Sequence, residues 1–289
     1  MRRGELVEAL DAYFCVPEVR NDDWLPGFED CYPDPYWREF VEPGYEGRWN
    51  GLMVRGGDEV TRAATCVFPS DRIVGGLEPG TFLFSEHPLD FAEETGFRPL
   101  ARGTFEAMRE REIAFYNAHA PLDMHPEVSP SRLIAEALGL TKLEEYAPIA
   151  DGISGGAAII GDSEDGLDEL AERLAAFLGS EIPVEVVDRG ARERAGRVAV
   201  VAGGGGDVEL LEQSLERGCE TYVTGNAARL PTHEFFRKKA LAFRRLAFER
   251  GVATVDGTHY GTEKPPQLAM AGWFRRLGLE AEFRPDGPK

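Results

Sequence analysis

Short apolar runs rich in β-branched and aromatic residues alternate with helical segments along most of this chain. The helical segments repeat their apolar residues with a period of about 3.6, as in LDELAERLAAFLG (167–179) and EFFRKKALAFRRLAFERG (234–251). This alternation predicts an α/β protein whose strands pair mostly in parallel. The expected strands cover residues 51–54, 63–68, 81–85, 113–118, 157–160, 184–188, 197–202, 221–224, 252–256 and 280–283.

Length, charge and hydropathy restrict the class of protein. The chain has 289 residues, 43% of them hydrophobic, so it can bury one large core or two small ones. Its formal net charge of −19 and pI near 4.7 argue against nucleic acid as a partner, because the phosphate backbone would be repelled. No apolar run approaches the roughly 18 residues of a membrane span, and the start of the chain resembles an amphipathic helix without a signal-peptide core. We therefore expect a cytoplasmic protein with no membrane partner.

Residues 16–49 interrupt the alternation. They are rich in proline, aromatic and acidic residues and show no clear period. We expect a long ordered insertion here. Two roles are open for it: a surface insertion held down by its aromatic side chains, or a lid over a substrate.

Polar side chains follow three of the expected strands. Glu86 and His87 come after 81–85, Asp123 after 113–118, and His259 and Glu263 after 252–256. Parallel sheets place functional groups at these strand ends. Adjacent strand residues point to opposite faces, so Glu86 and His87 would serve two neighbouring ions. The five side chains predict a dinuclear site with Asp123 as the bridging ligand, although a capping acid and a loop histidine are the ordinary alternatives for Glu263 and His259 taken singly.

His259 and Glu263 have the spacing of a helical i, i+4 pair, but Gly261 and Pro265–Pro266 argue against a helix through His259. We expect the helix to begin near Thr262 as its N-cap, with Glu263 in the first turn. The helix dipole would then stabilise the charged carboxylate.

A run of four glycines follows the strand at 197–202 and precedes a helix. Backbone N–H groups in this layout can bind a phosphate. The run departs from GxGxxG, because Val208 or Glu209 stands where the third glycine would be. An anion site and a tight strand-to-helix turn both stay open. The candidate phosphate-binding residues are Gly203, Gly204, Gly205 and Gly206.

Five motifs occur in the same order and at similar spacings as those of the Nif-three-like family, also called type 2 GTP cyclohydrolase I. They are WNGLMVRG (49–56), LFSEHPLDF (83–91), FYNAHAPLD (115–123), VAVVAGGGGDVELLEQSLERGCETYVTGNA (198–227) and VDGTHYGTE (255–263). From about residue 48 onward the chain resembles this family. The resemblance implies two related α/β halves, near 1–150 and 151–289, with a dinuclear metal site between them, and a toroidal homohexamer. We expect no separate inserted domain of the kind found in longer members, because residues 155–196 have room only for a short β-α-β piece. The resemblance also implies metal ligands at His87, Asp123, His259 and Glu263.

The chain departs from the family at two positions. Glu86 stands where the family usually has a second histidine, and Asn226 stands where many members have glutamate. A carboxylate in place of an imidazole favours Mn, Fe or Mg over Zn. We expect two divalent ions per subunit, drawn from Zn, Mn, Fe and Mg. His119 falls in a family motif and could act as a general acid/base or could orient Asp123.

Two classes of function are compatible with these features. The first is a metal-dependent hydrolase that activates water for attack on a nucleotide-type substrate, either at a purine ring carbon, as in GTP cyclohydrolase, or at a phosphoester. The resemblance places the glycine run beside that substrate. The second is a non-catalytic metal-binding scaffold or regulatory partner-binding protein. Fold alone does not decide between them.

Overall fold

The structure is a computed structural model that describes residues 1–16, 18–19, 30–189, 193–232 and 234–285. The chain forms two compact units. The first comprises Met1–Phe91, Phe97–Leu122 and a C-terminal segment that begins at Gln267; the second comprises Ala92–Gly96 and Asp123–Pro266. This division differs from the predicted halves 1–150 and 151–289. Pairing of strands far apart in sequence returns the C-terminal segment to the first unit.

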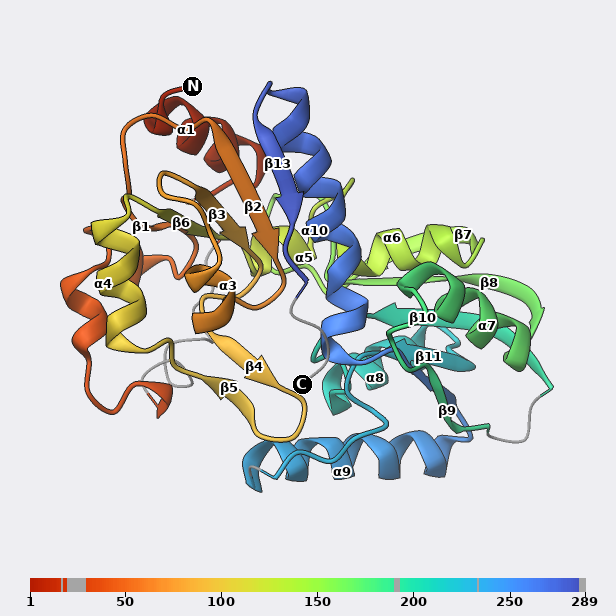
Figure 1. Cartoon of the computed structure of the whole chain (residues 1–289). Helices are drawn as coiled ribbons and strands as arrows, with labels where there is room; N and C mark the ends of the chain where they lie inside the picture. Colours follow the sequence, from red (N-terminus) through yellow and green to blue (C-terminus); the bar gives the residue numbers. More distant parts are fainter. Residues whose placement is uncertain (17, 20–29, 190–192, 233, 286–289) are drawn as a thin grey trace. The chain divides into compact units, whose positions relative to one another are not determined.

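The first unit contains a five-stranded sheet in the order β1-β6-β3-β2-β13 (Figure 1). Strands β6, β3, β2 and β13 run parallel, and β1 is antiparallel to β6. The prediction of a mostly parallel sheet is correct here. The strands are β1 (Gly51–Val54), β2 (Arg62–Cys66), β3 (Phe82–Ser85), β6 (Ala114–Asn117) and β13 (Glu280–Phe283), accompanied by α1 (Arg3–Tyr13), η1 (Tyr36–Glu39), η2 (Tyr45–Gly47), α3 (Asp71–Gly75) and α4 (Arg102–Glu110).

The second unit contains a six-stranded sheet in the order β7-β8-β10-β11-β12-β9. Only β10, β11 and β12 run parallel; the other three pairings are antiparallel. The prediction of mostly parallel pairing is therefore wrong for this sheet, because strands such as β7 and β8 follow each other without a crossover helix. The elements are β7 (Thr141–Tyr146), β8 (Ala158–Gly166), β9 (Glu185–Asp188), β10 (Arg194–Val201), β11 (Thr221–Thr224), β12 (Ala253–Asp256), α6 (Pro130–Ala137), α7 (Leu167–Leu178), α8 (Val208–Glu216) and α9 (Glu234–Arg250).

Three elements lie where the chain passes between the units. The hairpin of β4 (Asp90–Ala92) and β5 (Gly96–Arg98) contributes residues 92–96 to the second unit, and α5 (Ala120–Asp123) ends where that unit resumes. Helix α10 (His259–Arg276) belongs to the second unit up to Pro266 and to the first from Gln267. All ten predicted strands correspond to strands in the structure, whereas β4, β5 and the charged β7 were not predicted.

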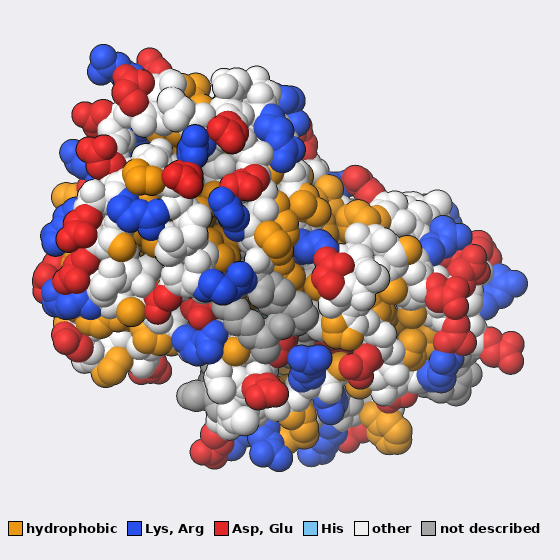
Figure 2. All heavy atoms as spheres, viewed as in Figure 1, with side chains coloured by type: hydrophobic (Ala, Val, Ile, Leu, Met, Phe, Trp, Pro, Cys, Tyr) orange, Lys and Arg blue, Asp and Glu red, His pale blue; other side chains and the backbone are white. Residues whose placement is uncertain are grey.

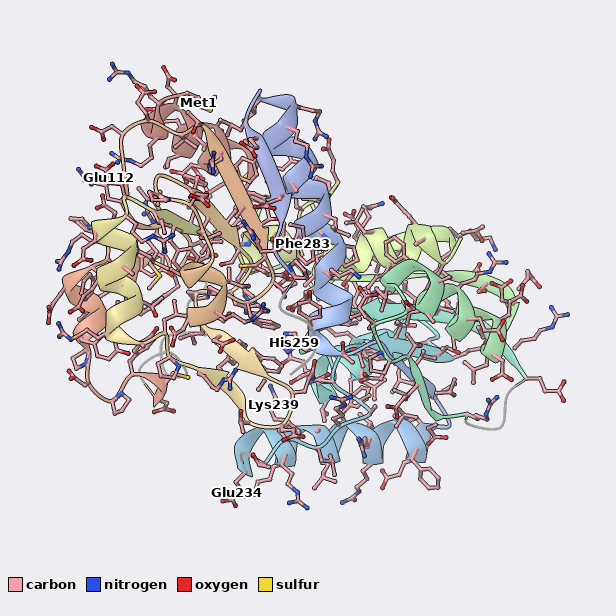
Figure 3. All side chains as sticks on the ribbon, in the orientation of Figure 1. Met1, Glu112, Glu234, Lys239, His259 and Phe283 are labelled. Atoms are coloured by element: carbon pink, nitrogen blue, oxygen red, sulfur yellow. The ribbon has the colours of Figure 1, made fainter. Side chains whose placement is uncertain are left out.

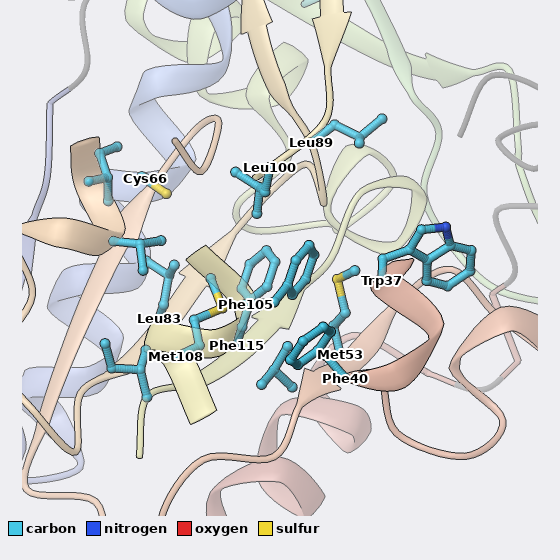
Figure 4. Packing of buried hydrophobic residues seen from close by; sticks show 14 of the residues in the cluster. Trp37, Phe40, Met53, Cys66, Leu83, Leu89, Leu100, Phe105, Met108 and Phe115 are labelled. Atoms are coloured by element: carbon cyan, nitrogen blue, oxygen red, sulfur yellow. The ribbon is translucent and has the colours of Figure 1, made fainter. Parts of the chain in front are cut away.

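Aromatic side chains from the described part of the 16–49 segment fill one side of the first unit's core. Trp37, Tyr45 and Trp49 are almost completely buried, and Phe40 stacks on Phe105 of α4 with ring centroids 5.4 Å apart (Figure 4). These contacts are anchors of the kind expected for an insertion held down by aromatic residues. The part of the insertion at residues 17 and 20–29 lies outside the described residues.

Charged side chains of both signs are interspersed over the face of the molecule in Figure 2. Many form surface ion pairs, such as Arg102 with Glu39 and Lys142 with Asp162. Such pairs stabilise a fold only slightly, because both partners remain hydrated. No helix within the described part of the chain is long and apolar enough to cross a membrane.

Candidate metal centre

Three neighbouring parallel strands of the second unit end at the same edge of their sheet. The glycine run 203–206 follows β10, Asn226 lies two residues beyond β11, and His259 lies three residues beyond β12. Segments that leave the carboxyl ends of parallel strands lie close together, so these polar and flexible groups gather in one place.

Helix α10 begins at His259, and the prediction that it begins near Thr262 is wrong. The Thr258 hydroxyl accepts the Gly261 N–H at 2.9 Å, and the Thr258 carbonyl accepts the Thr262 N–H at 3.1 Å. The helix therefore starts one turn earlier than expected, with Pro265 and Pro266 inside it. Tertiary packing overrides the low helix propensity of these residues.

Because His259 and Glu263 are both helical, they share one face of α10. His259 Nε2 and Glu263 Oε1 are 2.9 Å apart, and only 6% and 3% of the two residues are exposed (Figure 3 labels His259). The carboxylate orients the imidazole. Paired helical ligands of this kind are common at metal sites.

Asp123, at the end of α5, interacts electrostatically with this pair. Burial raises the pKa of Asp123 well above its ordinary value of 3.8, the negative charge of Glu263 raises it further, and His259 opposes the shift. For His259, burial lowers the pKa, but the charge and hydrogen bond of Glu263, with smaller contributions from Glu93 and Asp123, raise it above 6.5 overall. Among the predicted residues, the charges of Asp123, His259 and Glu263 thus act on one another within the second unit.

Glu93, in the hairpin segment 92–96, is a buried acid that the sequence did not indicate. It is 5% exposed, and its Oε1 accepts the Tyr260 N–H at 3.4 Å. Burial raises the pKa of Glu93, and the nearby His259 opposes that rise. A glutamate between two short strands is ordinarily exposed to water, so the local sequence gives no indication that Glu93 is buried.

His259 and Glu263, whose Nε2 and Oε1 are 2.9 Å apart, can contribute two ligands to a divalent cation. Three carboxylates, from Asp123, Glu263 and Glu93, influence one imidazole, that of His259. Desolvated carboxylates are costly unless they bind a cation or take up a proton. Carboxylate and imidazole together are the ligands that Mn, Fe and Zn accept in proteins.

Gly203 of the glycine run packs against the Glu263 carboxylate and His259 Nε2. Gly203 has φ of +59°, and a Cβ there would lie 2.8 Å from Glu263 Cδ and 3.2 Å from His259 Nε2. Its N–H donates to the Thr262 hydroxyl at 2.8 Å. No other residue type fits at Gly203 without displacing the ligands.

Two further amides of the run also donate within the chain: Gly205 N–H to Ala202 O at 3.2 Å, and Gly206 N–H to Asn226 Oδ1 at 2.6 Å. An anion bound by these amides would have to replace those hydrogen bonds. Phosphate binding at Gly203, Gly204, Gly205 and Gly206 stays a prediction.

The other predicted site residues belong to the first unit. Glu86 is fully buried just beyond β3, and its Oε2 accepts a hydrogen bond from Gln267 Nε2 at 3.3 Å. His87 stacks on Phe68 with centroids 4.5 Å apart, and its ring lies 4.7 Å from that of His119. The assignment of all five predicted ligands to one dinuclear centre stays a prediction.

Comparisons with known proteins agree with the motifs and the fold. The profile of the family described as Duf34/NIF3 (NGG1p interacting factor 3) matches residues 39–283. A protein of Deinococcus radiodurans named GTP cyclohydrolase 1 type 2 homolog is 31% identical over 289 residues, which span 97% of this chain and 92% of that protein.

Solved structures share the architecture. The protein ybgI, described as of unknown function, superposes with a TM-score of 0.68 at 21% identity, covering 99% of this chain and 100% of that chain. TTHA1606 from Thermus thermophilus has a TM-score of 0.63 at 24% identity, with coverage of 99% and 100%. At these identities the likeness establishes the fold alone. The family profile covers most of the sequence, and the chain belongs to the Duf34/NIF3 family.

Proposed function

We propose that this protein is a metal-dependent hydrolase that activates water for attack on a nucleotide-type substrate. The observation that carries the proposal is the group of desolvated carboxylates around His259 in the second unit. Such a group is stable at neutral pH when a divalent cation neutralises it. The printed name of the Deinococcus radiodurans relative, GTP cyclohydrolase 1 type 2 homolog, supports the nucleotide part of the proposal.

In this proposal Asp123, His259 and Glu263 are ligands supplied by the second unit. Glu86 and His87 of the first unit are the further ligands of a two-ion centre, with Asp123 bridging. The support is chemical: Glu86 and His87 are buried polar groups that follow a strand end, as the other ligands do. The identity of the ions, the homohexameric assembly and the cytoplasmic location are predictions from the sequence.

A divalent ion bound by these residues would supply a Lewis acid that lowers the pKa of water toward neutrality. The chain's own residues supply orientation and proton transfer. Glu263 fixes the His259 ring through the Nε2–Oε1 contact of 2.9 Å. His119 is the candidate general acid/base. Its backbone N–H donates to Asn50 Oδ1 at 2.9 Å.

The test is a screen of metal-loaded protein against nucleotides and generic phosphoesters, with Mn, Fe, Zn and Mg supplied in turn. We expect turnover that falls by at least about 100-fold in His259→Ala and in Glu263→Gln, because each removes a ligand. Glu164→Gln is the matched control, since the Glu164 side chain is 94% exposed in a surface ion pair. Metal binding without turnover under every condition would contradict the hydrolase and favour the scaffold or regulatory alternative.

Substitutions of Glu86 test whether the protein binds a second metal ion. Glu86→Ala is expected to lose about one metal ion per subunit, because a carboxylate ligand is removed, whereas Glu86→His should keep both ions and shift preference toward zinc. Elemental analysis under identical metal supply measures both. Unchanged metal content in Glu86→Ala would assign Glu86 to a structural role with Gln267, its hydrogen-bond donor.

A further inference from the structure

The Asn226 side chain joins Gly204 and Gly206 of the glycine run. Its Oδ1 accepts the Gly206 N–H at 2.6 Å, and its Nδ2 donates to the Gly204 carbonyl at 3.2 Å. The carboxamide thus uses its acceptor and its donor on either side of Gly205. Two further hydrogen bonds tie the run to β11 and the loop after it: the Tyr222 hydroxyl donates to the Gly205 carbonyl at 2.6 Å, and the Gly225 N–H donates to the Gly203 carbonyl at 3.1 Å.

Hydrogen bonds connect the glycine run to the helix turn that carries the proposed metal ligands. Gly203 donates its N–H to the hydroxyl of Thr262, and Thr262 Oγ1 lies 2.9 Å from the Thr258 carbonyl, to which it can donate. Thr262 is fully buried and lies on α10 between His259 and Glu263. Because Gly203 also packs against the Glu263 carboxylate, a shift of the run would move the surface that supports both ligands.

We propose that Asn226 is a positioning residue for the metal ligands. Its carboxamide fixes the glycine run so that Gly203 stays in contact with the Glu263 carboxylate and Thr262 keeps the first turn of α10 in register. The carboxamide offers an acceptor to Gly206 and a donor to Gly204 at the same time, whereas a carboxylate offers acceptors alone. An aspartate of nearly the same shape keeps the first bond, loses the second, and places a negative oxygen against the Gly204 carbonyl.

The first test rests on the proposed function, because it measures metal affinity. We expect Asn226→Asp and Asn226→Ala to weaken Mn²⁺ binding by about 10- to 100-fold, the usual effect of removing a group that orients a ligand. The melting temperature should stay near that of the wild type, since the hydrogen bonds from Tyr222 and Gly225 remain. Gln213→Glu, which adds one negative charge to α8, should bind Mn²⁺ as the wild type does. Wild-type affinity in both Asn226 variants would overturn the proposal.

The second test needs no metal and separates failure of the proposal from failure of the proposed function. Amide hydrogen exchange of metal-free protein reports the Gly206 and Gly203 hydrogen bonds separately. We expect both amides to exchange at least about ten-fold faster in Asn226→Ala, because the disturbance extends along the run to Thr262. Faster exchange confined to Gly206 would overturn the proposal even if the wild type binds metal. If the wild type binds no metal, loss of protection at both amides still supports the positioning role.

Discussion

Gly203→Ala is expected to weaken Mn²⁺ binding by on the order of 100-fold, because the new methyl group would occupy the space of the Glu263 carboxylate. The Cβ would lie 2.8 Å from Glu263 Cδ and closer still to Oε1. Since the obstructed group is the end of a flexible side chain, the carboxylate can rotate away. The fold then survives while the ligand is displaced. The positive φ of +59° adds a strain of roughly 1–2 kcal/mol to the folded state.

Gly204→Ala is the matched control for this change. A Cβ at Gly204 meets only His259 Cε1, at 3.7 Å, which is an ordinary contact distance. Calorimetric titration with Mn²⁺, together with urea denaturation, should show wild-type affinity in Gly204→Ala and a loss in Gly203→Ala. Equal affinities in the two variants would mean that Glu263 does not bind the metal in the position seen here.

The strand ends could be predicted because their signal is local. An apolar β-type run followed by polar residues marks the ends of β3, β6 and β12, and Asp123, His259 and Glu263 were found in this way. The start of α10 could not be predicted. Gly261 and Pro265–Pro266 indicate a helix boundary by propensity, whereas hydrogen bonds from Thr258 and burial of the whole turn decide the outcome.

The remaining differences come from contacts between residues far apart in the sequence. Glu93 lies more than 160 residues before its partner Tyr260, and no local pattern marks that pairing. Asp256 is similar: its Oδ2 accepts the Ala228 N–H at 2.9 Å and its Oδ1 accepts the Thr258 N–H at 2.8 Å, so it joins two strand-end loops. The division into two compact units also depends on such contacts, since the pairing of β13 with β2 depends on the assembled sheet.

The stability of the metal-free protein is expected to fall as the pH rises from about 5 to 8. Asp123 has a folded-state pKa raised well above 3.8, so the folded protein keeps a proton that the unfolded chain releases. His259 has a folded-state pKa raised above 6.5, so its contribution is fully present below pH 6.5 and is lost as the pH rises through the raised value. Both groups bind protons more tightly in the folded state. Each therefore lowers the free energy of unfolding with rising pH, by up to about 1.4 kcal/mol per pH unit.

The Asp123→Asn variant separates the contribution of Asp123 to this pH dependence from the contributions of the other titratable groups. The amide has nearly the shape of the carboxyl group but does not ionise, so the metal-free variant should be more stable than the wild type at pH 8. Mn²⁺ at about 100 times its dissociation constant should stabilise the wild type by about 2.7 kcal/mol and leave the variant almost unchanged. Urea denaturation between pH 5 and 8, with and without Mn²⁺, measures both quantities, and Glu164→Gln serves as the exposed control.

A metal-free wild type whose stability rises over this range, or an Asp123→Asn variant that Mn²⁺ stabilises as strongly as the wild type, would remove Asp123 from the ligand set. If both expectations hold, Asp123 exchanges its proton for a metal ion, because the same burial that raises its pKa makes the bound cation the favoured partner at neutral pH.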